Sequence, residues 1–406
     1  MNLRTLLVTM PSDARRVVLV QFLTALGYFS VIPFFVVYLV KVLGQSPAFA
    51  AGQLTLFLTG QYVASFAGAY LSHRTNPLLT MKVGLVLQIA TYALFATGVS
   101  AAPALCALSL ALGVSKAFFT PAAKAALVAL TPGENHYLLF SFRSTVNNLG
   151  VAVGSALGAA LIDQTAFAFF LFAACIQVVA LWVLRVVRAP ATAPERVARP
   201  KPAFGKAVRA VVGMPLAVIL MIVTLCYQFH YIQLEYALPL VADSAWGTDA
   251  VAHVFWVNAA AVMALQIPLN TWLSQRLSVY FTLALGFACM LLAFWLLAES
   301  SGRPLFLIGV LLFTLGEITI DPAIDALLSK GLAVDLLPVG FGVLGLMGLL
   351  GAVAGNAVAS RFVAAGDFTL FWYVNCALAA LAVALVAFYR KQDNPAFKEG
   401  LHGHHH

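Results

Sequence analysis

The sequence predicts an all-α membrane protein with twelve transmembrane helices in two pseudo-symmetric six-helix bundles. The first observation is composition: 62% of the 406 residues are hydrophobic and 9% are charged, whereas a soluble domain carries about 25% charged residues. Most side chains must therefore be solvated by lipid. The second observation is that the second half of the chain repeats segments of the first. At this length the chain can form roughly twelve spans of ~20 residues joined by short loops.

The apolar runs are continuous and of helix length, so each can satisfy its backbone hydrogen bonds internally. They do not alternate like the strands of a barrel. We expect spans at about 17–41, 50–71, 80–99, 103–124, 138–161, 165–186, 213–240, 250–273, 279–298, 304–325, 338–360 and 369–389.

One unit centred on the fourth span recurs in the tenth. Residues 112–127 and 313–328 align at one fixed offset, and both contain a Pro-Ala pair followed by Ala and Leu. The alignment places opposite charges at matching positions. A charge inside a membrane span is costly and indicates a functional site. The matched residues are Pro121 with Pro322, Lys116 with Glu317, and Lys124 with Asp325.

Two further matches show that the whole half is duplicated. Leu71-Ser-His-Arg74 recurs as Leu273-Ser-Gln-Arg276, and the glycines of 150–154 recur in 351–355. The sequence therefore predicts bundles at 1–186 and 213–400, joined by a linker at 187–212 that is rich in Pro, Ala and Arg. Many secondary transporters are built from such repeats, with the substrate site at the repeat interface. We exclude 401–406 from the fold as a probable remnant of a purification tag.

The basic residues predict the orientation in the membrane. They gather in the short loops on one side, which is the cytoplasmic side by the positive-inside rule. Both termini and the linker are then cytoplasmic, in the inner membrane. Orientation also explains the net charge of +8 better than nucleic-acid binding does. Arg74, Lys82, Arg276 and Lys330 are among the residues on the basic side, and Lys41, Arg303 and Arg361 lie on the other.

Several kinds of chemistry lack their motifs. The sequence has no glycine-rich phosphate loop, no His-Glu-x-x-His pattern and no Gly-x-Ser-x-Gly elbow. The five cysteines fall at unrelated spacings within apolar runs, which is typical of small core residues. We therefore expect no enzyme activity, no catalytic residue, no metal and no cofactor beyond a proton gradient.

Three segments resemble the major facilitator superfamily, and within it the twelve-helix drug:proton antiporters. The loop at 71–79 is similar to the family's signature between spans 2 and 3, with His73 where Asp is usual, followed by Arg74. The glycines of span 5 resemble the antiporter signature, with Ser155 in place of proline. Leu315-Gly-Glu317 with Pro322 resembles the tenth span of several members. The resemblance implies two halves that rock around a central cavity, with His73 and Arg74 at a gate.

The family fold places Lys116 and Glu317 at that cavity, where their protonation could be coupled to substrate. The alternative is a structural salt bridge that only neutralises two buried charges. The fold also makes span 7 a cavity-lining helix. Glu235 on it is either a proton carrier or an interfacial carboxylate already in water. His230 is either a titrating cavity residue or a hydrogen-bonded structural histidine.

Span 5 begins with polar residues. Arg143 and Asn147 share one face as i, i+4 neighbours. Arg143 either binds an anionic substrate group, holds the cytoplasmic gate, or extends to the inner interface. Gly150, Gly154 and Gly158 are spaced to let another helix approach closely.

Two further sets of residues complete the expected site. Asp321 and Asp325 near the end of span 10 are candidates for a salt bridge with Lys124 that closes the inward gate, or are solvated helix-end charges. Tyr231 and neighbouring aromatic residues could line a cavity for amphiphiles.

Three functions fit these residues. The first is proton-coupled export (antiport) of small amphiphilic molecules by alternating access, as in multidrug efflux. The second is proton-coupled transport of a zwitterionic or carboxylate metabolite such as a peptide, amino acid or siderophore. The third, from another class, is a non-transporting membrane receptor or scaffold. The expected partners are a small-molecule substrate, protons and the lipid bilayer, with the chain acting as a monomer.

Overall fold

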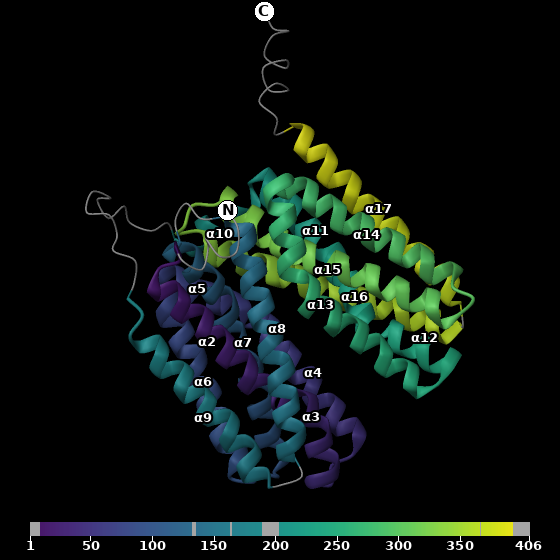
Figure 1. The fold of residues 1–406 in the computed structure, drawn as a ribbon. Coiled ribbons are helices and arrows are strands. Elements are labelled where there is room, and N and C mark those ends of the chain that lie inside the picture. Colours follow the sequence, from purple (N-terminus) through teal and green to yellow (C-terminus); the bar gives the residue numbers. More distant parts are fainter. Residues whose placement is uncertain (1–8, 132–134, 163–164, 189–202, 366, 393–406) are drawn as a thin grey trace, which may run out of the picture.

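The structure is a computed structural model that describes residues 9–131, 135–162, 165–188, 203–365 and 367–392. Within these ranges the chain is helical and contains no strand. Figure 1 shows two groups of helices, one from each half of the chain. This arrangement confirms the predicted all-α fold class.

The first group contains the six predicted spans of the first half of the chain. Its elements are α2 (Ser12–Phe29), α3 (Ile32–Val37), the π-helical turn η1 (Tyr38–Val42), α4 (Pro47–Val63), α5 (Ser65–Arg74), α6 (Pro77–Ala96), α7 (Ala102–Leu130), α8 (His136–Ile162) and α9 (Ala166–Arg185).

The second group follows a short helix, α10 (Phe204–Val212), and repeats the arrangement. Its elements are α11 (Pro215–Tyr231), the 3-10 turn η2 (Ile232–Leu234), α12 (Ala237–Trp246), α13 (Thr248–Arg276), α14 (Val279–Glu299), α15 (Arg303–Gly331), α16 (Leu337–Ala365) and α17 (Phe368–Gln392).

Ten helical segments of the described chain are long and apolar enough to cross a membrane. The two other predicted spans, α4–α5 and α8, pack alongside them against α7 and α2. The protein is therefore a multi-pass membrane protein. Residues 189–202 of the predicted linker and the tail at 401–406 lie outside the described residues, and α10 occupies the last part of the linker.

Three spans that look continuous in sequence are interrupted. The first span is divided between α2 and α3, and two others are broken for identifiable reasons. Between α4 and α5 the Ser65 hydroxyl donates to the Tyr62 carbonyl at 2.6 Å, and such local bonds compete with helical ones. Span 7 breaks between η2 and α12. Pro239 lies in the first turn of α12, where its missing N–H is tolerated. All three interruptions are corrections to the sequence-based prediction of single helices.

The fourth and tenth spans extend further than predicted. They were expected to end at 124 and 325, yet α7 continues to Leu130 and α15 to Gly331. Lys124 and Asp325 consequently lie inside their helices and not at the helix ends. A span predicted from hydropathy ends at the first charged residue. Here the helices continue past Lys124 and Asp325 because the two charges pair with each other inside the protein.

Glycines set the closest helix contacts, and they do so equivalently in the two groups. On α8, a Cβ at position 150 would lie 2.8 Å from the Phe22 carbonyl oxygen of α2, and a Cβ at Gly154 would overlap the Leu26 carbonyl. On α16, a Cβ at position 355 would lie 2.7 Å from the Phe229 carbonyl oxygen of α11. Only glycine permits such an approach of backbones.

The two groups join at one end. We call this the α10 end, because α10 lies there in contact with α5, α11 and α16. Contacts between the groups run from α8 to α13 and α15, and from α16 to α4, α5 and α7. Figure 1 shows the groups meeting beside α10 and diverging toward α3 and α12.

The glycine packing predicts a difference between two alanine variants. Gly154→Ala places a methyl group against the α2 backbone and should lower the free energy of unfolding by about 1–3 kcal/mol. Gly52→Ala in α4 meets no atom within 4 Å and should leave stability unchanged or slightly raised. Thermal unfolding in detergent measures both. Equal melting temperatures for the two variants would contradict the packing account.

Candidate functional site

Two cavities lie between the helix groups. One, of about 240 Å³, is lined from α4, α5 and α7 on one side and from α11, α15 and α16 on the other. The second, of about 230 Å³, lies between α8 and the helices α11, α13 and α15. Tyr227, Gln228 and Asp321 line both cavities, so the two spaces are adjacent. Together they place α7, α8, α11 and α15 around one central region.

Lys116 lines the first cavity from the middle of α7. Its Nζ atom lies 3.9 Å from the centroid of the Tyr28 ring and 5.6 Å from that of Phe29. An ammonium group over an aromatic face is stabilised by the ring quadrupole. Lys116 forms no ion pair with Glu317 in the described structure, so the alternative of a simple structural salt bridge between them is not what is found.

Glu317 lines the second cavity from α15 and has a different partner. Asn258 on α13 donates to its Oε2 atom at 2.7 Å and to the Thr314 hydroxyl at 3.1 Å. The amide therefore orients the carboxylate toward the cavity without neutralising its charge. Asp321, one turn along α15, lines both cavities, and no hydrogen bond or ion pair of its carboxylate is found among the described residues.

The residues predicted on span 7 separate into three environments. Tyr231 lines the second cavity, with its ring 5.8 Å from that of Tyr227. Glu235 is exposed, directly after η2, and is not among the described residues that line either cavity. His230 is fully buried and faces away from both cavities. Its Nε2 atom lies 3.1 Å from the Asn375 carbonyl oxygen on α17, and its ring lies 5.0 Å from that of Phe294.

That environment makes His230 a structural residue of the second group. Its inclusion among the cavity residues is therefore corrected. The sequence placed it on a cavity-lining helix, but α11 also packs against α17, and His230 lies on that side. Glu235 is exposed in this structure, and its two alternatives, a proton carrier and an interfacial carboxylate, both stay predictions.

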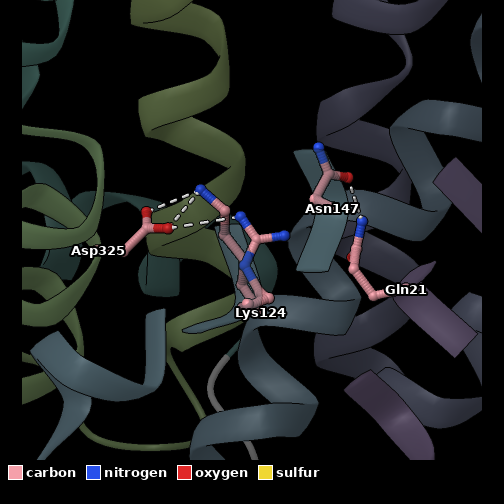
Figure 2. Close-up of polar contacts among 5 residues, drawn as sticks. Gln21, Lys124, Asn147 and Asp325 are labelled. Atoms are coloured by element: carbon pink, nitrogen blue, oxygen red, sulfur yellow. Dashed lines mark hydrogen bonds and ion pairs between the residues drawn. The ribbon is translucent and has the colours of Figure 1, made fainter. Parts of the chain in front are cut away.

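Arg143 and Asn147 both line the second cavity from α8. Arg143 is buried, its Nε–H finds no acceptor among the described residues, and its guanidinium lies 3.9 Å from the Asp325 carboxylate. Asn147 accepts a hydrogen bond from Gln21 of α2 at 2.8 Å, which holds the amide beside the cavity (Figure 2). Arg143 therefore has an N–H donor that is not used by the described residues, beside a cavity lined by polar side chains.

Lys124 and Asp325 form an ion pair across the two groups. The Lys124 Nζ atom lies 2.7 Å from Oδ2 and 2.8 Å from Oδ1 of Asp325, as Figure 2 shows. Asp325 is 3% exposed, so it is not a solvated helix-end charge. Lys124 also lies over the Phe341 ring of α16, at 5.5 Å. This pair closes the first cavity toward the α10 end.

Asn270 of α13 also connects the two groups. Its amide accepts from the Tyr137 hydroxyl at 2.6 Å and donates to the Ser141 hydroxyl at 2.8 Å, both on α8. It also donates to the Ile318 carbonyl at 2.7 Å. That carbonyl lacks its helical partner because Pro322, four residues later, has no N–H. The buried Asn270 amide therefore supplies the hydrogen bond that the Ile318 carbonyl lacks, and it also links the second helix group to α8 of the first.

His73 contributes a further contact between the groups. It is buried at the end of α5, and its Nδ1 atom lies 3.2 Å from the Asp335 carbonyl oxygen in the α15–α16 connection. Arg74 stays on its own helix, where its Nε donates to the Tyr70 hydroxyl at 3.3 Å. Of the two residues expected at a gate, His73 thus reaches across to the other group.

Comparison with known proteins identifies the family. The family model described as Major Facilitator Superfamily matches residues 17–336. The chain belongs to the major facilitator superfamily. It is 26% identical over 379 residues to the uncharacterized MFS-type transporter YqjV of Bacillus subtilis (strain 168), covering 89% of each chain. It is 25% identical over 354 residues to the multidrug resistance protein MdtH of Shigella sonnei (strain Ss046), covering 82% of this chain and 83% of that one.

The fold also matches solved structures of the superfamily. The E. coli fucose:proton symporter FucP superimposes with a TM-score of 0.78 at 13% identity, covering 92% of this chain and 98% of that chain. The predicted resemblance to the superfamily is confirmed. The protein is a transporter and not an enzyme, and the alternative of a non-transporting receptor or scaffold is set aside.

Several site residues escaped the sequence analysis. Asn258, Gln266 and Asn270 all lie on α13, the eighth span, and each hydrogen-bonds to a charged or polar side chain of α8 or α15. A signal was present, because polar amides within an apolar span are costly unless they find partners. That span has no charged residue in its middle, and its three amides share no repeat or motif that would have singled them out.

The role of Asn270 predicts a non-additive pair of substitutions. Asn270→Ala leaves the Ile318 carbonyl unpaired and should lower the free energy of unfolding by about 1–3 kcal/mol. Pro322→Ala restores a backbone N–H to that carbonyl, so Asn270→Ala should cost less in that background. A double-mutant cycle from chemical or thermal unfolding measures the coupling. Strictly additive effects would mean that Asn270 does not compensate for the missing N–H of Pro322.

Proposed function

We propose that this transporter couples the export of small amphiphilic molecules to proton entry (antiport), by alternating access in the inner membrane. In this proposal both termini and the α10 end are cytoplasmic, as the basic loops predict. The chain works as a monomer in the bilayer. The observation that carries the proposal is that Glu317 and Asp321 face the central cavities beside the rings of Tyr227 and Tyr231.

These residues supply the two properties that antiport requires. Aromatic rings offer apolar surface to an amphiphile, and a carboxylate among them can hold either a proton or the positive end of a substrate. Asp321 has no protein partner among the described residues, and Glu317 has only a neutral amide partner. A carboxylate without a cation of its own favours uptake of one from outside the protein. Competition of substrate and proton for the same carboxylate links their movements.

Two of the similar proteins support this choice. Proteins named as multidrug resistance proteins are among those similar to the chain. FucP, which shares the fold, is a fucose:proton symporter. The direction and the substrate class are therefore parts of the proposal and rest on the cavity residues.

The decisive experiment is pH-gradient-driven transport in proteoliposomes, screened over cationic dyes and small carboxylates. Glu317→Gln should abolish gradient-dependent flux, because the variant cannot carry a proton, while Glu235→Gln tests the second candidate carrier. Glu299→Gln is the matched control, since Glu299 is exposed at the end of α14 and bonds to Tyr373 far from the cavities. If the flux is the same with and without a pH gradient, and the same in the parent and in Glu317→Gln, proton coupling is refuted.

A second candidate function is transport of a carboxylate-bearing or zwitterionic metabolite. The observation that favours it is Arg143, whose buried guanidinium lines the cavity with an unused Nε–H donor. A guanidinium binds carboxylates through paired hydrogen bonds. Lys116 offers a second cation nearby, and Glu317 would meet the amino group of a zwitterion.

The two candidates predict different responses to Arg143 variants. If a carboxylate is the substrate, Arg143→Lys should raise the apparent KM for it by about tenfold or more, since the ammonium cannot bind in the bidentate mode. Transport of a cationic dye should change much less. Competition assays in the same proteoliposomes distinguish these cases. An equal loss for both substrate types would assign Arg143 to conformational closure through Asp325 and not to substrate binding.

A further inference from the structure

A third cavity lies at the α10 end, apart from the two central ones. Its volume is about 450 Å³, larger than either of them. Asn135 and Tyr137 line it from the α7–α8 connection and the start of α8, and the remaining lining comes from α11, α13, α14 and α15. Residues of both helix groups therefore form its wall. The transport mechanism proposed above does not use this space.

The polar groups of this cavity favour an anion. Lys330 is the one charged side chain among the described residues that line it. Thr282 also lines it. This threonine is 1% exposed, and its hydroxyl has no hydrogen-bond partner in the described structure. A buried hydroxyl without a hydrogen-bond partner raises the free energy of the folded protein. A ligand that accepts a hydrogen bond from Thr282 would remove this cost.

Two long helices begin at the same cavity. The Asn135 side chain accepts from the Leu138 N–H at 3.2 Å at the start of α8, and the Ser278 hydroxyl accepts from the Phe281 N–H at 3.3 Å at the start of α14. Each side chain satisfies only one of the N–H groups that a first turn leaves without a helical acceptor. Helix N-termini of this kind bind phosphate groups. Their dipoles add to the charge of Lys330.

We propose that this cavity binds a phosphate group, carried by an anionic phospholipid or taken up as free phosphate. The apolar part of the wall, formed by Leu277, Val279 and Leu327, suits the first carbons of an acyl chain. The cavity also lies where the membrane-spanning segment of α14 begins at Val279, which is the depth of lipid headgroups. These two features make the phospholipid the expected source of the phosphate.

A purely structural role for Lys330 explains less. Lys330 lies in the last turn of α15, where a cation is favoured by the helix dipole. That interaction accounts for the charge, but it does not account for the unpaired Thr282 hydroxyl or for the space beside it. Because both helix groups line the cavity, a ligand there binds only while the groups are joined at the α10 end. Such a ligand shifts the population toward that arrangement.

The test uses the purified, delipidated full chain in neutral detergent, with three probes. Short-chain phosphatidylglycerol carries an anionic headgroup, short-chain phosphatidylcholine is the zwitterionic control, and inorganic phosphate represents the free anion. Thermal shift and titration report binding. Lys330→Ala should weaken phosphatidylglycerol binding about fivefold, the contribution of one lysine near a lipid surface. Lys206→Ala, an exposed lysine of α10 that does not line the cavity, should change it less than twofold.

Thr282→Val separates ligand binding from folding. The substitution keeps the side-chain shape and removes a hydroxyl without a protein partner, so the ligand-free melting temperature should be unchanged or higher, while affinity falls about fivefold. Phosphatidylglycerol binding that inorganic phosphate does not imitate supports the lipid source, and Lys330-dependent binding of inorganic phosphate supports a site for the free anion. Equal binding of phosphatidylcholine, or binding insensitive to both Lys330 and Thr282, would overturn the proposal.

Discussion

The arrangement of the two helix groups depends on one buried carboxylate. Asp325 is buried within α15, and its charge is neutralised by Lys124 from the other group, with Arg143 nearby. Removing one partner of a buried ion pair typically costs about 3–5 kcal/mol, because the remaining charge stays unpaired. The groups can therefore separate at the α10 end only if water or another ion replaces Lys124. The amide of Asn270 and the His73 contact add neutral bonds at the same end.

The internal duplication explains why this end closes while the centre stays hollow. Equivalent positions of α7 and α15 carry opposite charges in two layers, eight residues or roughly 12 Å apart along the helices. In the layer nearer the α10 end, Lys124 and Asp325 meet. In the other layer Lys116 lies on the Tyr28 ring and Glu317 bonds to Asn258, so the opposite charges stay apart. The paired layer joins the groups, and the unpaired layer leaves charges facing the cavities, as the proposed function requires.

The sequence predicted the features of this structure that follow from hydropathy and from the internal repeat. Hydropathy placed the spans, the spacing and repeat of the glycines predicted close helix packing at equivalent positions, and the register of the repeat selected Lys124 and Asp325. The remaining features depend on tertiary partners. The extension of α7 and α15 beyond their charges requires knowing that the charges pair. Asn270 acquires its role from Pro322, which lies on another helix. His230 is buried against α17 because of how α11 is rotated, which its position along the span does not reveal.

The most direct test of the central claim is the distance across the α10 end, measured by pulsed electron spin resonance in reconstituted protein. Spin labels at Leu79→Cys and Gln275→Cys, both exposed at that end, would be read in a background without the five native cysteines. The account predicts a short distance in the parent and a longer population in Asp325→Asn. The charge-exchanged double variant, Lys124→Asp with Asp325→Lys, should restore the short distance. An unchanged distance in Asp325→Asn, or no restoration by charge exchange, would contradict the claim that this ion pair holds the two halves together.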